Sequence, residues 1–87
     1  MKTYRHLITN DEGLHARIAV LLVQICRDVQ CQVEVWNREN HANGADVFAV
    51  MKLGAGKGDG LEFRLEGAAE EEILLQVIQF CTEHLSE

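Results

Sequence analysis

The sequence predicts an α+β fold, a two-layer sandwich in which helices pack on one face of a sheet. Three observations predict it. Short segments with alternating apolar and polar residues are separated by segments in which apolar residues recur every three or four positions. The order of these segments along the chain is β-α-β-β-α-β-α, without an internal repeat or a linker. At 87 residues the chain has material for one modest core, so we expect a single domain over residues 1–87.

The composition is typical of a soluble globular protein and excludes several classes of function. Hydrophobic residues make up 47% of the chain and charged residues 25%, unlike a disordered or fibrous protein. The formal net charge is −6 and no run of lysine or arginine offsets it, so we expect no nucleic-acid partner. No segment resembles a signal peptide or is apolar enough to span a membrane. We therefore expect a cytoplasmic protein without membrane insertion.

The cysteines give no sign of a disulfide framework. Cys26, Cys31 and Cys81 form an odd set without CxxC spacing. A zinc site has a different pattern, so the sequence favours free, mostly buried thiols.

The first expected strand covers residues 3–9, where alternation suits one buried face carrying Tyr4, His6 and Ile8. A polar turn at residues 10–13 ends it. Residues 16–28 then have the spacing of an amphipathic helix, which begins immediately after His15. The apolar positions of this helix are Ala19, Leu22, Val23 and Cys26.

A hairpin is expected after this helix. Residues 31–36 alternate again, and residues 37–40 have the composition of a turn. The returning segment, residues 41–44, has little β propensity, which is typical of a short edge strand held by its neighbour.

The second half of the chain is expected to form a short helix, a strand and the longest helix. Asp46 can cap a helix over residues 47–51. The glycine-rich segment 54–60 lacks the phosphate-binding pattern GxxxxGK[ST], so we expect a flexible connection there. Residues 61–66 alternate as a strand. The last helix, residues 69–85, has one apolar face made by Ile73, Leu74, Val77, Ile78, Cys81 and Leu85.

One short constellation, Gly13-Leu14-His15-Ala16-Arg17, suggests a specific chemistry. It places an imidazole at the N-cap of a helix and a guanidinium inside the first turn, so both can converge on one anion. The first N–H groups of a helix lack intrahelical partners, and the helix dipole adds partial positive charge there. A phosphoryl group on His15 can accept hydrogen bonds from the amides of Ala16 and Arg17, and the Arg17 guanidinium adds charged donors.

Histidine suits transient phosphoryl carriage. A neutral ring nitrogen is nucleophilic near physiological pH, and the P–N bond stays labile enough to pass the group on. From residue types alone a second interpretation stays open, in which His15 only caps the helix and Arg17 is a solvated surface charge.

The segment GLHARIA, from Gly13 to Ala19, closely resembles the active-site motif of HPr, the histidine-containing phosphocarrier family of the bacterial sugar phosphotransferase system. The segment VMKLGAGKG, residues 50–58, is similar to the HPr segment after the short second helix. The resemblance extends over essentially the whole chain, in register and in element order.

The resemblance implies an open-faced sandwich of four antiparallel strands with three helices on one face. It also implies that His15 receives a phosphoryl group from phosphorylated enzyme I and delivers it to a IIA domain, with Arg17 as its catalytic partner. Such a protein is a stoichiometric carrier rather than an enzyme. We expect it to be a monomer that needs no cofactor and no metal.

Ile18 departs from the family pattern, which usually has proline at this position in the first helical turn. Proline presets the backbone and removes one N–H group. Because Ile18 restores that N–H group, we expect the helix to begin at the same place. The Ile18 amide is then a further candidate for phosphate binding, beside those of Ala16 and Arg17.

Asp46 is the second departure. HPr proteins of many Gram-positive bacteria have a serine at this regulatory position, which HPr kinase phosphorylates, and a carboxylate cannot accept that group. We therefore expect this control to be absent. The fixed negative charge of Asp46 can resemble the phosphorylated state, or the side chain can simply cap the short helix, and both interpretations stay open.

The apolar contact surface expected around His15 consists of Val20, Val47, Phe48 and Met51. Exposed apolar side chains there indicate a docking surface, and packing of single residues into the core is the alternative. The departures also fit a divergent HPr-like paralogue. Its alternative role is a binding module that signals carbon or nitrogen state to a regulatory protein partner.

Overall fold

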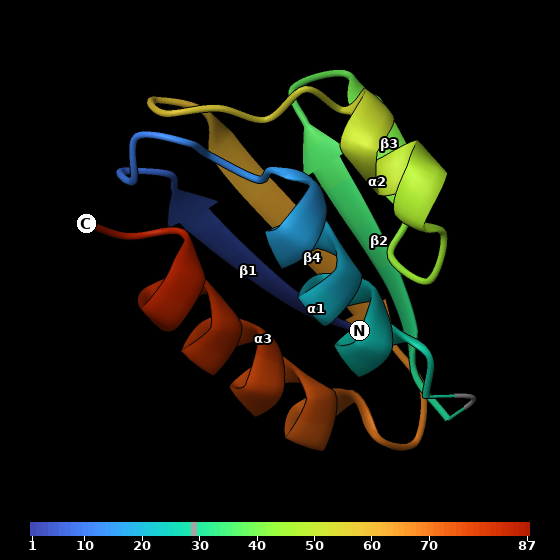
Figure 1. Cartoon of the computed structure of the whole chain (residues 1–87). Coiled ribbons are helices and arrows are strands. Elements are labelled where there is room, and N and C mark those ends of the chain that lie inside the picture. The colour runs from blue at the N-terminus through green and yellow to red at the C-terminus, as the bar shows by residue number, and fades with distance from the viewer. Residues whose placement is uncertain (29) are drawn as a thin grey trace.

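The computed structural model describes residues 1–28 and 30–87, which form the expected order of elements (Figure 1). The strands are β1 (Lys2–Leu7), β2 (Gln32–Asn37), β3 (Asn40–Asn43) and β4 (Gly60–Glu66). The helices are α1 (Ala16–Cys26), α2 (Val47–Lys52) and α3 (Glu70–His84). Within the described ranges, no helix has both the length and the apolar character needed to cross a membrane.

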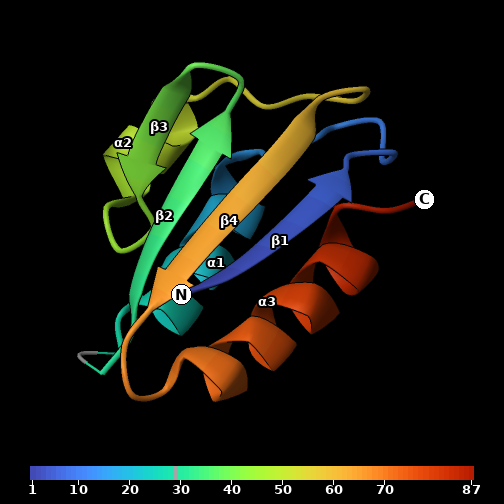
Figure 2. The same ribbon diagram turned by 180° about the vertical axis from the view of Figure 1, so that it is seen from behind.

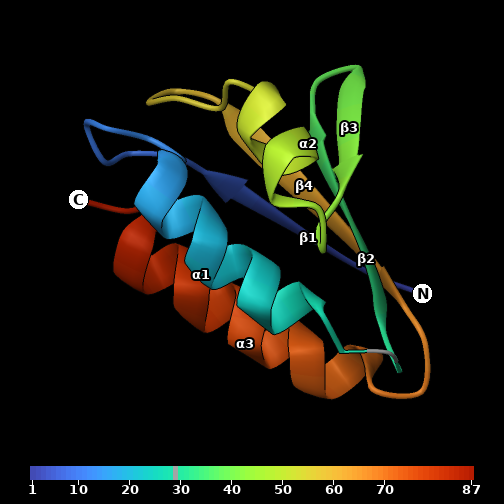
Figure 3. The ribbon, with the colours of Figure 1, turned by 45° about the vertical axis from the view of Figure 1, so that its right-hand side comes forward.

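The strands form one antiparallel sheet in the order β1-β4-β2-β3. Strand β4 comes late in the chain but lies in the middle of the sheet, where its Phe63 is paired with Tyr4 of β1 and Val35 of β2. In Figure 2 the sheet lies in front of α1, and Figure 3 shows the helical layer from the side. The predicted open-faced sandwich, with all three helices on one face, is therefore confirmed.

The core lies between the sheet and the helices because both layers turn an apolar face inward. From the sheet, the fully buried side chains are Val33, Val35, Leu61, Phe63 and Leu65. Helix α1 buries Ile18 together with its predicted apolar positions Ala19, Leu22, Val23 and Cys26. Each large side chain that is removed from water in this way contributes about 1.5–3 kcal/mol before entropy is counted.

Helix α3 differs from the prediction in the extent of its apolar face. It buries Phe80, which the expected face omits, together with Ile73, Val77 and Cys81. Leu74 and Ile78, both predicted on this face, are only half-buried. The edge of the apolar face is set by contact with α1 and β1, which a helical period cannot specify.

The three cysteines are free and buried, as predicted. Burial raises the pKa of Cys26 and of Cys81 to about 12, with the neighbouring thiols adding to the effect. A thiol in this environment stays protonated at neutral pH, so these side chains act as small hydrophobic groups rather than nucleophiles.

Candidate functional site

The turn before α1 requires glycine at position 13. Gly13 has φ +64°, and its N–H and C=O groups both hydrogen-bond to Asn10, at 3.3 Å to the backbone oxygen and 3.1 Å from the side-chain amide. A Cβ on Gly13 would lie 2.6 Å from the carbonyl oxygen of Ala55. The N–H of Leu14 donates to that same oxygen at 3.0 Å. The chain therefore reaches His15 along a path that strongly favours glycine.

His15 occupies the N-cap position of α1, with extended backbone angles of φ −82° and ψ 173°. Its carbonyl oxygen accepts the first helical hydrogen bond, from Ala19 N–H at 2.8 Å. The half-buried imidazole makes no capping hydrogen bond to the first turn that the structure describes. The ring therefore does not serve as a cap, and the helix begins where the sequence predicts, despite isoleucine at position 18.

Three backbone N–H groups follow the imidazole. They belong to Ala16, Arg17 and Ile18, the first residues of α1. The N–H groups in the first turn of a helix have no carbonyl acceptor within that helix. The first turn of α1 carries no acidic side chain to compete for these donors. The helix dipole places partial positive charge at the same point, so the arrangement favours an anion beside His15.

The side chains of these residues point to different surroundings. Arg17 and Ala16 are exposed, and Ile18 is buried in the core. Arg17 is thus on the surface beside the N-terminus of α1, while Ile18 fixes the turn by packing. Of the Ile18 groups, only its backbone N–H is a candidate for anion binding.

The immediate surroundings of the turn are partly acidic. Asp11 forms an exposed ion pair with Lys57, with Oδ1 and Nζ 3.0 Å apart. An exposed pair of this kind stabilises the fold by at most about 1 kcal/mol. Its effect on the site is local, because Lys57 offsets a negative charge that would otherwise repel an anion.

Asp46 is the N-cap of α2. Its Oδ1 accepts hydrogen bonds from the N–H groups of Phe48 and Ala49, both at 3.1 Å. The capping interpretation is therefore confirmed, and the likeness to a phosphorylated side chain stays a hypothesis.

The predicted contact residues are largely exposed. The exposed fraction is 74% for Phe48, 47% for Val20 and 43% for Met51, while Val47 is half-buried against the core. Leu21 adds a partly exposed apolar side chain that was not predicted as part of this surface. Helices α1 and α2, which carry these residues, pack against one another.

The glycine-rich loop is more firmly held than a flexible connection. The N–H of Gly58 donates to Ile8 O at 2.8 Å, and the N–H of Gly56 donates to the Asp59 carboxylate at 2.9 Å. The carbonyl oxygen of Ala55 accepts a hydrogen bond from the Leu14 N–H. Sequence reasoning missed Asp59 because its partners are known only once the loop has been placed against β1 and α1.

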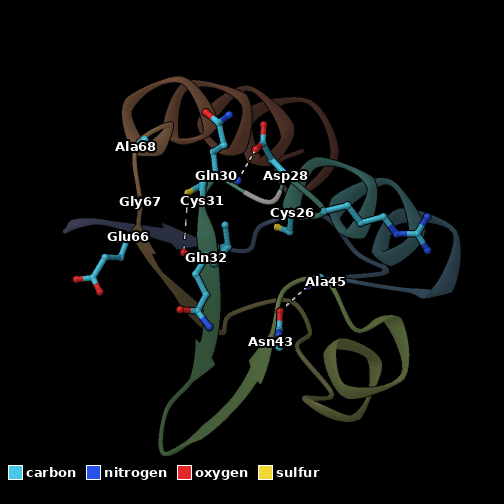
Figure 4. Close-up of a pocket in the computed structure, with 12 residues that line it drawn as sticks. Cys26, Asp28, Gln30, Cys31, Gln32, Asn43, Ala45, Glu66, Gly67 and Ala68 are labelled. Atoms are coloured by element: carbon cyan, nitrogen blue, oxygen red, sulfur yellow. Dashed lines mark hydrogen bonds between the residues drawn. The ribbon is translucent and has the colours of Figure 1, made fainter.

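A surface hollow lies at the other end of α1 (Figure 4). It has a volume of about 590 Å³ and is lined by Cys26 and Cys31 and by polar residues such as Asn43 and Glu66. None of the predicted site residues lines it. Among the described residues, no cluster of His, Cys, Asp or Glu side chains is able to hold a metal ion.

Fold and site together define a class, a small open-faced α+β sandwich with a histidine at the N-terminus of a helix. Residues 3–83 match the family described as "PTS HPr component phosphorylation site". The phosphocarrier protein HPr of Pseudomonas aeruginosa is 38% identical over 81 residues, which cover 92% of this chain and 90% of that protein. The phosphocarrier protein NPr of Escherichia coli is 36% identical over 72 residues, covering 82% and 80%.

Solved structures agree with the sequence relatives. The crystal structure of HPr from Thermoanaerobacter tengcongensis superposes with a TM-score of 0.89 at 30% identity, over 100% of this chain and 98% of that one. The histidine-containing phosphocarrier protein of Mycoplasma, at 20% identity and a TM-score of 0.92, shares the fold. The chain belongs to the HPr family of phosphocarrier proteins of the phosphotransferase system.

Proposed function

We propose that this protein carries a phosphoryl group on His15, which it receives from phosphorylated enzyme I and delivers to a IIA domain. The observation that supports this most directly is the position of the imidazole, at the N-cap of α1 and immediately before three N–H groups without helical partners. The exposed guanidinium of Arg17 supplies a further charged donor.

Each transfer exchanges one P–N bond for another. A neutral ring nitrogen of His15 attacks phosphorus, the bond to the donor histidine breaks, and the donor nitrogen keeps that electron pair. Both bonds are of one kind, so little driving force is needed and positioning is the main task. The carrier then acts as a stoichiometric intermediate in the cytoplasm, as a monomer and without a resident cofactor or metal.

The amides of Ala16, Arg17 and Ile18 bind the phosphoryl oxygens in this proposal. Their donors are fixed by the helix before the group arrives, so binding needs no reorganisation of the backbone. This pre-organisation stabilises phosphohistidine while leaving its outer face open to the next protein.

The docking surface in this proposal consists of Val20, Val47, Phe48 and Met51. Exposed apolar side chains on two adjoining helices are suited to a transient protein interface of modest size. Enzyme I and IIA domains use the same surface in turn, because each has to bring its own histidine to His15.

A labelling experiment tests the carrier role. The protein is incubated with its cognate enzyme I, Mg²⁺ and radiolabelled phosphoenolpyruvate, and acid-labile label is measured on the wild type, on His15→Ala and on His41→Ala. His41 is an exposed histidine on β3 and serves as the control. We expect label on the wild type and on His41→Ala only. An unlabelled wild type, with an enzyme I that is active on another carrier, contradicts the proposal.

A second role, as a regulatory binding module, is favoured by Asp46. Its carboxylate places a permanent negative charge at the start of α2, next to Val47 and Phe48. A strain that has only the His15→Ala variant separates the two roles. Loss of sugar uptake supports the carrier, whereas normal uptake with altered carbon or nitrogen control supports the module.

A further inference from the structure

Two polar side chains, the buried Asn37 and the partly exposed Asp59, meet beside the loop that follows α2. Asn37, the last residue of β2, is only 8% exposed. Its Nδ2 donates to the carbonyl oxygen of Leu53 at 3.0 Å and to Asp59 Oδ2 at 3.4 Å. The same carboxylate oxygen accepts from Gly56 N–H at 2.9 Å. One pair of side chains thus joins a central strand, the end of α2 and the loop.

This loop sets the path of the chain into His15. Ala55 O accepts the Leu14 N–H at 3.0 Å, and a Cβ on Gly13 would be 2.7 Å from the Cα of Gly56. The two segments lie side by side near the N-terminus of α1 in Figures 1 and 3. A shift of the loop therefore moves the two residues that precede the imidazole.

Considered for core packing alone, a polar side chain at position 37 lowers the stability of the fold. Within the described chain the Oδ1 atom of Asn37 is buried without a hydrogen-bond partner, a situation that costs about 1–3 kcal/mol. The other inward residues of β2 are Val33 and Val35. An apolar side chain would suit the core at this position, but it cannot hold Leu53 and Asp59. If the side-chain amide of Asn37 were flipped, its oxygen would face the Leu53 carbonyl and the Asp59 carboxylate, which are both acceptors. These partners therefore assign Nδ2 to the position that faces them.

We propose that Asn37 and Asp59 are positioning residues for phosphoryl transfer, which place His15 by holding the loop 54–59 against Gly13 and Leu14. The inference rests on the proposed function. Neither side chain touches the phosphoryl group or exchanges a proton in the transfer. A displacement of about 1 Å at a reacting atom can lower a rate about 100-fold, so loosening this loop affects transfer more than it affects stability.

The test compares Asp59→Ala and Asp59→Asn in the labelling reaction with enzyme I, with the carrier concentration varied. The alanine variant loses the acceptor for Gly56, and we expect kcat to fall about 10-fold. KM should stay within about 2-fold, because the docking surface on α1 and α2 is unchanged. The asparagine variant keeps an acceptor oxygen, so we expect it to restore most of the rate.

Glu62→Gln is the matched control. Like Asp59→Ala it removes one negative charge, but it does so on β4, where Glu62 forms ion pairs with Arg5 and Arg64 on the open face of the sheet. We expect wild-type kinetics from it. Hydrogen exchange of the Leu14 amide gives a readout without phosphorylation, and we expect faster exchange in Asp59→Ala than in the control. If Asp59→Ala does not fold, Asn37→Ser, which is too short to reach both acceptors, takes its place.

The outcomes separate the two proposals. A folded Asp59→Ala with wild-type kcat, or with unchanged Leu14 exchange, overturns the positioning role even if His15 is the phosphorylated residue. A wild type that accepts no label overturns the carrier function, and the positioning role falls with it whatever the Leu14 exchange shows.

Discussion

Substitution of Gly13 by alanine tests how tightly the loops around His15 are packed. The backbone angle of φ +64° is unfavourable for any residue with a Cβ, by about 1–2 kcal/mol. The new Cβ would also lie 2.6 Å from Ala55 O, so the loop has to retreat and its hydrogen bond to Leu14 weakens, for about 1 kcal/mol more. We expect Gly13→Ala to lower the free energy of unfolding by about 2–3 kcal/mol.

Gly54→Ala is the control that separates the two effects. Gly54 has nearly the same angle, φ +59°, but a Cβ there meets no atom within 4 Å. Thermal unfolding followed by circular dichroism should show Tm lowered by about 5–10 °C for Gly54→Ala and by about 10–20 °C for Gly13→Ala. Equal shifts in the two variants would refute the contact between Gly13 and the Ala55 loop as the source of the difference.

Three further predictions concern charge and pH. Arg17→Ala should slow phosphoryl acceptance in the enzyme I assay about 10- to 100-fold, because a charged hydrogen bond contributes about 1.5–3 kcal/mol. The control is Arg27→Ala, which removes an exposed arginine at the far end of α1. Asp46→Ala should lower the free energy of unfolding by about 1 kcal/mol in urea titration, because α2 loses its cap, whereas Asp46→Ser should retain most of it. The pKa values of about 12 for Cys26 and Cys81 lie above the ordinary 9.0, so the folded state keeps protons that the unfolded state releases. The contribution of these two thiols to stability should therefore be constant below pH 9 and fall between pH 9 and about 12, by about 1.4 kcal/mol per pH unit for each thiol. A Cys26→Ala variant that shows the same alkaline slope would contradict this.

Much of the fold was predictable because period and composition agree along most of the chain. Alternation in residues 61–66 and the helical spacing after His15 each led to the correct element. The short edge strand was also expected, although it begins at Asn40 rather than His41. The first residue of β3 is set by its pairing with β2, in which Asn37 is opposite Asn40. The sequence of β3 alone does not encode that pairing.

The candidate site was predictable only as far as it is local. His15 and Arg17 are two positions apart, at the start of an amphipathic helix, so their relation follows from helical geometry. Asn37 and Asp59 are 22 residues apart and meet only after β2 has joined the sheet. Polar residues at the end of a strand and in a glycine-rich loop have the composition of ordinary turns, so their contact carried no sequence signal.

The central claim is that the first-turn amides of α1 hold a phosphoryl group on His15. It is tested most directly by NMR of the ¹⁵N-labelled protein before and after phosphorylation by enzyme I. The account predicts a phosphorus–nitrogen coupling in the His15 ring and marked shifts of the Ala16, Arg17 and Ile18 amide signals, which reverse when the P–N bond is hydrolysed. A phosphorylated His15 with these three amides unshifted, or a phosphoryl group on another residue, would contradict it.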